Sequence, residues 1–306
     1  MAQHDQEENE SGLSPDASTL EFAWGLAEAW NLTANTIKKS LTRARTATLV
    51  LLVAGACAGA IGAASASSGN NQPGWAVVAA LSLGFAGMLE TFVVTPTKTR
   101  QWTAARMASE RLVAAVWTYL TATAPYDGTD AEKAAALRLT IRAVETQTKG
   151  VNRPTAPIAR PLPEPGEGGI AALYRTDRAQ DQLDYHRVKG ASEEKKGDLF
   201  RGVVLFLTAA GAALVALSSI EDLFNTSLGA WVAMLTTATA AVTTHSRASR
   251  FHEVAAGYDR TCVSLELEMH RFSQEADKEA GLPTFVANIE SVLAHQNNTW
   301  AETVDG

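Results

Sequence analysis

The uncharged stretch TATLVLLVAGACAGAIGAAS (residues 46–65), followed after a turn by GWAVVAALSLGFAGML (74–89), decides the fold of this chain. No charged residue occurs from Thr46 to Leu89, and the intervening SSGNNQPG (67–74) has the glycine, asparagine and proline chemistry of a turn. A helix needs about 20 apolar residues to cross a bilayer. The pattern therefore predicts two membrane spans, at about residues 46–66 and 74–95, joined as a helical hairpin.

The same pattern returns in the second half of the chain. Residues 202–220 carry no charge, Glu221 and Asp222 mark a loop, and residues 223–246 are again free of acids, Lys and Arg. This predicts spans at about 201–220 and 224–246. An offset of 156 residues aligns matching positions of the two hairpins without a gap, including Arg45 with Arg201, Gly55 with Gly211 and Trp75 with Trp231.

The predicted fold class is an all-α integral membrane protein, with two tandem two-span helical hairpins (four transmembrane helices) and cytoplasmic helical coils. Two buried hairpins inside a large soluble protein are the alternative. Four uncharged helices of this length are unusual in a soluble core, because core helices of soluble proteins are amphipathic rather than apolar all round.

The distribution of basic residues predicts the orientation of the hairpins. Lys and Arg flank each span at the end that lies away from its hairpin loop. The two loops inside the hairpins contain neither residue. By the positive-inside rule, both hairpins insert from the cytoplasm, and the N-terminus, the C-terminus and the large polar segments stay there. The flanking basic residues are Lys38, Lys39, Arg43, Arg45, Lys98, Arg100, Arg106, Arg111, Arg187, Lys189, Lys195, Lys196, Arg201, Arg247, Arg250 and Arg260.

Composition divides the chain into five parts. Residues 1–17 are an acidic tail that we expect to be disordered. Residues 18–149 form the first unit, the proline- and glycine-rich residues 150–168 form a linker, and residues 169–280 form the second unit. Residues 281–306 form a C-terminal helix and tail. Apolar residues from Phe251 to Met269 recur at coiled-coil spacing, which predicts a helix that packs against a partner helix.

Charge and motifs exclude several classes of protein. The net charge of −7 equals the seven acids that precede Lys38, so the rest of the chain is neutral, unlike a basic nucleic-acid binder. The six histidines form no HExxH motif, the two cysteines lack metal-ligand spacing, and the chain contains neither a P-loop nor GxGxxG. We therefore expect no enzyme activity, no cofactor and no metal.

A family resemblance adds to this interpretation. Tyr174-Arg175-x-x-Arg178-x-x-x-Gln182 precedes a two-span hairpin, and a helix that carries Tyr258 follows it. This arrangement resembles the SLATT family, and the first half, with QWTAARMASERLVAAVWTYLTATAPY after its hairpin, is similar to a SLATT variant. Together the similarities cover most of residues 20–275. The resemblance implies a membrane effector of the bacterial inner membrane that opens pores in antiviral (anti-phage) defence.

The family's members accompany nucleotide-second-messenger synthases or SLOG-type sensors. We expect this chain to carry no fused sensor or nucleotidyltransferase domain. The resemblance therefore implies that a trigger arrives in trans, as a nucleotidyltransferase partner or its nucleotide product, or binds the coils directly.

Polar residues of the predicted spans are candidates for a pore lining. Thr236, Thr239 and Thr243 share one face of the fourth span. Their hydroxyls either line a water-filled path or bond back to carbonyls of their own helix. Glu90 either forms a ring that favours cations, or lies at the headgroup level and pairs with Lys98 or Arg45.

Two further sets of residues have both a structural and a functional interpretation. Gly55 and Gly59 form a GxxxG motif, and Gly211 is the counterpart of Gly55; such glycines pack helices closely, either within a hairpin or between subunits. A basic run precedes the third span and serves topology and lipid attraction, or binds a nucleotide-type polyanion. Its members are Arg175, Arg178, Arg187, Lys189, Lys195 and Lys196.

The sequence thus leads to two hypotheses. In the first, the protein is a homo-oligomeric channel or pore-forming effector in membrane lipid, with a tetramer as our working number of subunits, gated at its cytoplasmic coils. In the second, it is a non-conducting membrane scaffold whose coils recruit a cytosolic partner.

Overall fold

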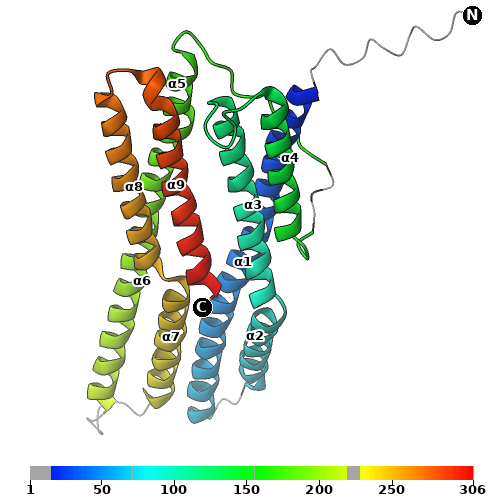
Figure 1. The fold of residues 1–306 in the computed structure, drawn as a ribbon. Helices are drawn as coiled ribbons and strands as arrows, with labels where there is room; N and C mark the ends of the chain where they lie inside the picture. The colour runs from blue at the N-terminus through cyan, green and yellow to red at the C-terminus, as the bar shows by residue number, and fades with distance from the viewer. Residues whose placement is uncertain (1–14, 70–71, 153, 155, 219–227, 306) are drawn as a thin grey trace, which may run out of the picture. The chain divides into compact units, whose positions relative to one another are not determined.

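The computed structural model describes residues 15–69, 72–152, 154, 156–218 and 228–305, and every regular element within these ranges is a helix (Figure 1). The all-helical class predicted from the sequence is confirmed. The elements are α1 Pro15–Ser67, α2 Pro73–Phe92, α3 Pro96–Leu120, α4 Asp130–Gln147, α5 Gly169–Tyr174, the π-helix η1 Arg175–Gln180, α6 Asp181–Ser218, α7 Leu228–Ser249, α8 Phe251–Gln274 and α9 Lys278–Asp305.

Several helices begin at residues that suit a first turn. The first residues of α1, α2 and α3 are Pro15, Pro73 and Pro96, and proline suits a first turn because its missing N–H has no partner there. α4 begins with a capping box in which the Thr129 backbone N–H donates to Glu132 Oε2 at 2.8 Å. This hydrogen bond stabilises the charged carboxylate and lowers the pKa of Glu132.

The chain folds into two compact units that cut across its two sequence halves. The core unit contains the described residues up to Ile37, Arg100–Arg187 and the described residues from Asp259 onward. The hairpin unit contains Lys38–Thr99 and Val188–Tyr258. Each half of the sequence therefore contributes helices to both units.

The first hydrophobic cluster of the core unit joins the start of α1 to α3 and α4. An apolar stripe of α1 is inside it: Leu20, Trp24 and Trp30, which recur at helical spacing, are all buried. Leu112 of α3 and Leu137 of α4 are fully buried against it. Burial of large apolar side chains is the main stabilising contribution in this part of the chain.

A row of aromatic rings runs from this first cluster into a second one. Trp24 packs edge-on against Trp117 with ring centroids 6.4 Å apart, and Trp117 packs edge-on against Tyr174 at 5.7 Å. Tyr174 is edge-on to Phe285 at 5.8 Å, and Phe285 stacks on Phe272 at 4.2 Å. Because edge-to-face and stacked pairs are favourable geometries, the row connects the first half of the sequence to the second through side-chain contacts.

The apolar stripe of α8 packs inside the same chain. Leu265 is fully buried in the second cluster, together with Cys262 and with Val286 and Ile289 of α9. At Cys262 and Leu265 the coiled-coil spacing therefore corresponds to contacts within one chain.

The predicted linker is fastened to α1 at its described residues. The Trp24 indole N–H donates to the Pro161 carbonyl at 3.0 Å, and the Arg160 guanidinium lies 4.0 Å from the centre of the Trp24 ring. The Ile158 N–H donates to the Gly25 carbonyl, and a side chain at Gly25 would meet the Ile158 oxygen at 2.6 Å. Glycine at position 25 allows this close approach.

The hairpin unit places its apolar side chains on the outside. α2 runs alongside the second part of α1, and α7 alongside the second part of α6 (Figure 1). Phe92 is 69% exposed and Phe206 is 72% exposed, although both belong to apolar helices. In the most apolar 18-residue stretches of α1, α2 and α6, only 17%, 11% and 0% of the residues are buried. An apolar surface of this kind is typical of a helix that contacts lipid.

Three helical stretches are long and apolar enough to cross a membrane, by length and composition: Thr19–Ser67, Pro73–Phe92 and Gly169–Leu217. The described part of the fourth expected span, α7, is not among them. Its five threonines, together with His245 and Arg247, lower its hydropathy. Residues 224–227 of that span lie outside the described residues, so the four-span arrangement stays a prediction.

The buried stripe of α8 generates a stability prediction. Leu265→Ala should lower the free energy of unfolding by about 2–5 kcal/mol, because it opens a cavity in the second cluster. Val263→Ala is the matched control on the same helix. Val263 is 65% exposed, so its loss should change the stability by less than about 0.5 kcal/mol. Thermal unfolding of the solubilised protein measures both, and equal losses would contradict the assigned burial.

Candidate functional site

A buried ion pair lies at the centre of the core unit. Arg178, on the π-helix η1, is 4% exposed. Its Nε and Nη2 donate to the two carboxylate oxygens of Glu290 on α9, each at 2.9 Å. The Tyr174 hydroxyl donates to Glu290 Oε1 at 3.0 Å, and Glu110 of α3 lies 3.8 Å from Arg178 Nη1. This Arg178 cluster consists of Arg178, Glu290, Tyr174 and Glu110. It joins the consecutive elements α5 and η1 to α3 and α9, which are distant in sequence.

The electrostatics of the cluster keep its arginine charged and its tyrosine neutral. Burial by itself disfavours the guanidinium charge, but the carboxylates of Glu290 and Glu110 outweigh it and raise the pKa of Arg178. Burial and the neighbouring Glu290 charge raise the pKa of Tyr174 well above its usual range, because both disfavour a phenolate. The bidentate geometry satisfies the buried charges, which is the condition for tolerating them in a core.

The π-helix explains how Arg178 reaches the core. A π-turn widens the helix, and such turns are frequent at functional sites. Here it turns two consecutive residues, Arg178 and Ala179, toward the interior. Exposed residues precede them, including Arg175. The turn therefore separates two arginines of the same motif into a buried one and a solvent-exposed one.

This placement corrects one expectation from the sequence. Arg178 was among the expected contacts for a polyanion, but its guanidinium is buried and engaged by two carboxylates, so it does not offer itself to a ligand. The other members of the basic run are exposed. Arg187 pairs with Glu266 at 2.7 Å, and Lys196 pairs with Glu193 at 2.6 Å. Arg175 and Arg187 belong to the core unit, whereas Lys189, Lys195 and Lys196 belong to the hairpin unit.

Sequence reasoning missed Glu290 and Glu110. Glu290 lies in α9 among the apolar residues Phe285, Val286, Ile289 and Leu293, all of which are buried. A carboxylate inside such a stripe is itself a signal, because a buried charge needs a buried partner of opposite sign. The assignment of residues 281–306 to a terminal helix and tail obscured that signal.

The threonines of α7 donate to their own helix. The Thr236 hydroxyl donates to the Val232 carbonyl at 2.9 Å, and the Thr239 hydroxyl donates to the Leu235 carbonyl at 2.7 Å. Thr236 is exposed, and Thr239 and Thr243 are half-buried. The hydroxyl hydrogens of Thr236 and Thr239 therefore bond back to their own helix, as the second interpretation states. Each hydroxyl oxygen can still accept a hydrogen bond from water. Glu90 is exposed near the end of α2.

The glycines of the hairpin unit differ in what they contact. Gly55 is buried, and a side chain there would meet Ser82 Cβ at 3.2 Å and Leu83 Cγ at 3.3 Å, so this glycine lets α1 and α2 approach closely. A Cβ atom added at Gly211 would lie 4.0 Å from Leu235 Cβ of α7, which is an ordinary contact distance. Gly59 is exposed, with open space where a side chain would be. The GxxxG motif thus has one residue inside its hairpin and one on the outer surface.

Comparison with known families gives two matches. Residues 174–300 match the SMODS and SLOG-associating 2TM effector domain 1 (SLATT), and residues 28–134 match a family described as a protein of unknown function (DUF4231). No curated protein and no solved structure matches the chain. The first match confirms the resemblance noted in the sequence. It begins at Tyr174 and includes Arg178 and Glu290, and it extends over residues 281–300, beyond the predicted end of the second unit at residue 280.

The Arg178 cluster generates a prediction with a built-in control. Glu290→Met should lower the free energy of unfolding by about 3–5 kcal/mol, because it leaves the Arg178 charge buried without its main partner. Arg178→Met combined with Glu290→Met should recover more than half of that loss. Glu266→Met removes the exposed pair with Arg187 and should cost about 0–1 kcal/mol. Thermal unfolding in detergent measures all three. A double variant as unstable as the single one would contradict the assignment of the loss to an uncompensated charge.

Proposed function

Because residues 174–300 place the chain in the SLATT family of two-transmembrane effector domains, we propose that the protein is a membrane effector that assembles into a homo-oligomeric channel or pore. The hairpin unit lies in the bacterial inner membrane, and the core unit lies in the cytoplasm with both termini. The trigger is a nucleotide-type ligand or a partner protein that acts on the core unit, and the biological setting is defence against phage.

The observation that carries this proposal is the contrast in burial between the two units. Large apolar residues such as Trp30 and Leu265 are buried in the core unit, whereas Phe206 and Phe92 are exposed in the hairpin unit. A soluble protein would hide such side chains, because every apolar square ångström left in water costs about 25 cal/mol. Lipid removes that cost, which supports a membrane location for the hairpin unit.

Several copies are needed for a conducting path in this proposal. In each chain Gly55 and Gly62 allow α1 and α2 to pack in close contact. A Cβ atom added at Gly62 would lie only 3.2 Å from Trp75 Cβ. A hairpin packed this tightly leaves no room for ions between its own helices. The exposed Gly59 offers a surface on which a neighbouring copy can approach closely. A tetramer remains our working number.

A scaffold without conductance is the second candidate function. The back-bonded hydroxyls of Thr236 and Thr239 favour it, because they reduce the number of free donors on the proposed path. In that case the exposed arginines and lysines of the basic run recruit a cytosolic partner. The two functions differ in one measurable property, which is leakage through a membrane that contains only this protein.

The orientation is tested with a reporter that is active only in the cytoplasm. Fusions at residues 10, 155 and 300 should be active, whereas fusions at residues 71 and 225 should be silent, since the loops inside the hairpins lack Lys and Arg. A reporter that is active only in the periplasm provides the reciprocal control. Cytoplasmic activity at residue 71 would refute the orientation.

Conductance is tested in liposomes and planar bilayers that contain the purified protein. The parent protein should release a trapped dye or ions, and Thr239→Leu should reduce the release severalfold because an apolar side chain dries a narrow path. Thr239→Ser should keep it, and Glu90→Gln should weaken the preference for cations. Thr237→Leu is the matched control, because Thr237 also donates to its own helix, at 2.9 Å, but lies on a neighbouring face. A parent protein that inserts and releases nothing would support the scaffold instead.

A further inference from the structure

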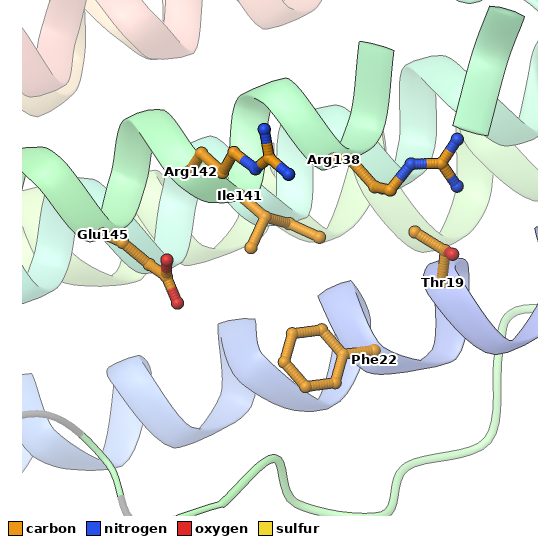
Figure 2. A pocket seen from close by; sticks show the side chains of 6 residues that line it. All are labelled: Thr19, Phe22, Arg138, Ile141, Arg142 and Glu145. Carbon is orange, nitrogen blue, oxygen red and sulfur yellow. The ribbon is translucent and has the colours of Figure 1, made fainter. Parts of the chain in front are cut away.

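An open cleft of about 530 Å³ lies between the first turns of α1 and the middle of α4. Figure 2 shows Thr19 and Phe22 on one side of it, and Arg138, Ile141, Arg142 and Glu145 on the other. All six residues belong to the core unit. The cleft is distinct from the Arg178 cluster, and neither the family match nor the proposed function assigns it a role.

The chemistry of the cleft suits an anionic chain. Arg138 and Arg142 are four residues apart on α4, so both guanidinium groups project on the same side of the helix, and both are exposed. Within the described residues neither guanidinium has an ion pair. Glu145 carries the one carboxylate of the cleft and has an interaction of its own. Two cations and one anion leave a positive balance.

An apolar surface accompanies these charges. Phe22 is 39% exposed at the cleft, while Ile141 behind it is buried. The other aromatic side chains of the core-unit part of α1, Trp24 and Trp30, are by contrast buried. An occupant that covers Phe22 would gain the burial that the described residues do not supply.

The chain itself contains a segment of matching charge. Asp5, Glu7, Glu8 and Glu10 lie within six residues, and no Lys or Arg precedes Lys38. The segment enters α1 at Pro15, four residues before Thr19 at the rim of the cleft. Thr19 and Arg138 lie at the same end of the cleft (Figure 2). Of the two cleft arginines, Arg138 is therefore the nearer to the point where the acidic segment joins the helix.

The distances permit the contact. Five residues separate Glu10 from Pro15, and an extended chain covers about 3.3 Å per residue, so the Glu10 carboxylate reaches about 17 Å from the helix start. Arg138 and Arg142 are about 6 Å apart along α4. A short tether also raises the local concentration of the segment, so that several exposed ion pairs, each worth about 0–1 kcal/mol, act together.

We propose that the acidic segment, residues 5–10, docks in this cleft, with its carboxylates on Arg138 and Arg142. The segment is then a built-in occupant that an external polyanion must displace before it reaches these two arginines. A consequence for gating rests on the proposed function, whereas the docking itself does not.

Cross-linking tests the docking directly. In the full chain, Arg138→Lys keeps the charge and supplies an amine, which a carbodiimide joins to a carboxylate in contact with it. We expect cross-links from the introduced lysine to Glu7, Glu8 or Glu10, identified by mass spectrometry in dilute detergent solution, and suppressed at high salt. Leu139→Lys is the matched control, because Leu139 is 65% exposed on α4 but does not line the cleft. Equal cross-linking from both positions would overturn the proposal.

Competition with inorganic pyrophosphate gives an independent measurement. Deletion of residues 2–12 should raise the affinity for pyrophosphate about tenfold, and Arg138→Gln with Arg142→Gln should abolish that gain. Arg175→Gln, at an exposed arginine outside the cleft, should leave the gain intact. Equal pyrophosphate affinity with and without residues 2–12 would overturn the proposal and indicate an external anion as the occupant.

These two measurements are separate from the proposed function. Both are made on solubilised protein and need no conductance. If the protein leaks and the cross-links are absent, the docking fails and the channel stands. If the cross-links form and the liposomes stay sealed, the docking stands and the channel fails.

Discussion

The hairpin unit carries more apolar surface than this chain is able to cover, and the rest of the structure follows from that constraint. Its helices expose Phe92, Phe206 and other large side chains on nearly every face, while their contacts with each other depend on small residues such as Gly55. A membrane satisfies the exposed surface, and the small residues make close helix pairs without a large apolar core. The hairpin unit therefore derives little of its stability from the interior packing that dominates the core unit.

The core unit has the opposite design, and it joins the two sequence halves. The aromatic row from Trp24 to Phe272 and the ion pair between Arg178 and Glu290 both cross from one half to the other. A buried ion pair is weak evidence for stability, but it specifies one arrangement, because any other leaves a charge unpaired. The pair therefore fixes one register of η1 against α9 within the core unit. Four helices, α1, α3, α6 and α8, have residues in both the core unit and the hairpin unit.

Charged residues are distributed unevenly along the chain. The acids before Lys38 account for the whole net charge, and the cleft lined by Arg138 and Arg142 offers two cations close to where those acids enter α1. The basic run is arranged differently, since Arg187 and Lys196 are already paired with neighbouring acids. The two guanidinium groups of the cleft differ from these, because they have no ion pair within the described part of the chain.

The sequence by itself determined the helical class, the long apolar stretches of α1, α2 and α6 and the family of residues 174–300, because each depends on local composition or a short motif. It also marked Gly55 as a close contact. Only the tertiary structure decided that Arg178 is buried while Arg175 is exposed, since a π-turn, invisible in the pattern of charges, rotates one of them inward. The partners Glu290 and Glu110 are 112 and 68 residues away from Arg178 in sequence, and no local period specifies which distant carboxylate meets a buried arginine. The stripe of α8 shows the same limit: its spacing predicts a partner helix, and only the fold shows that the partner belongs to the same chain.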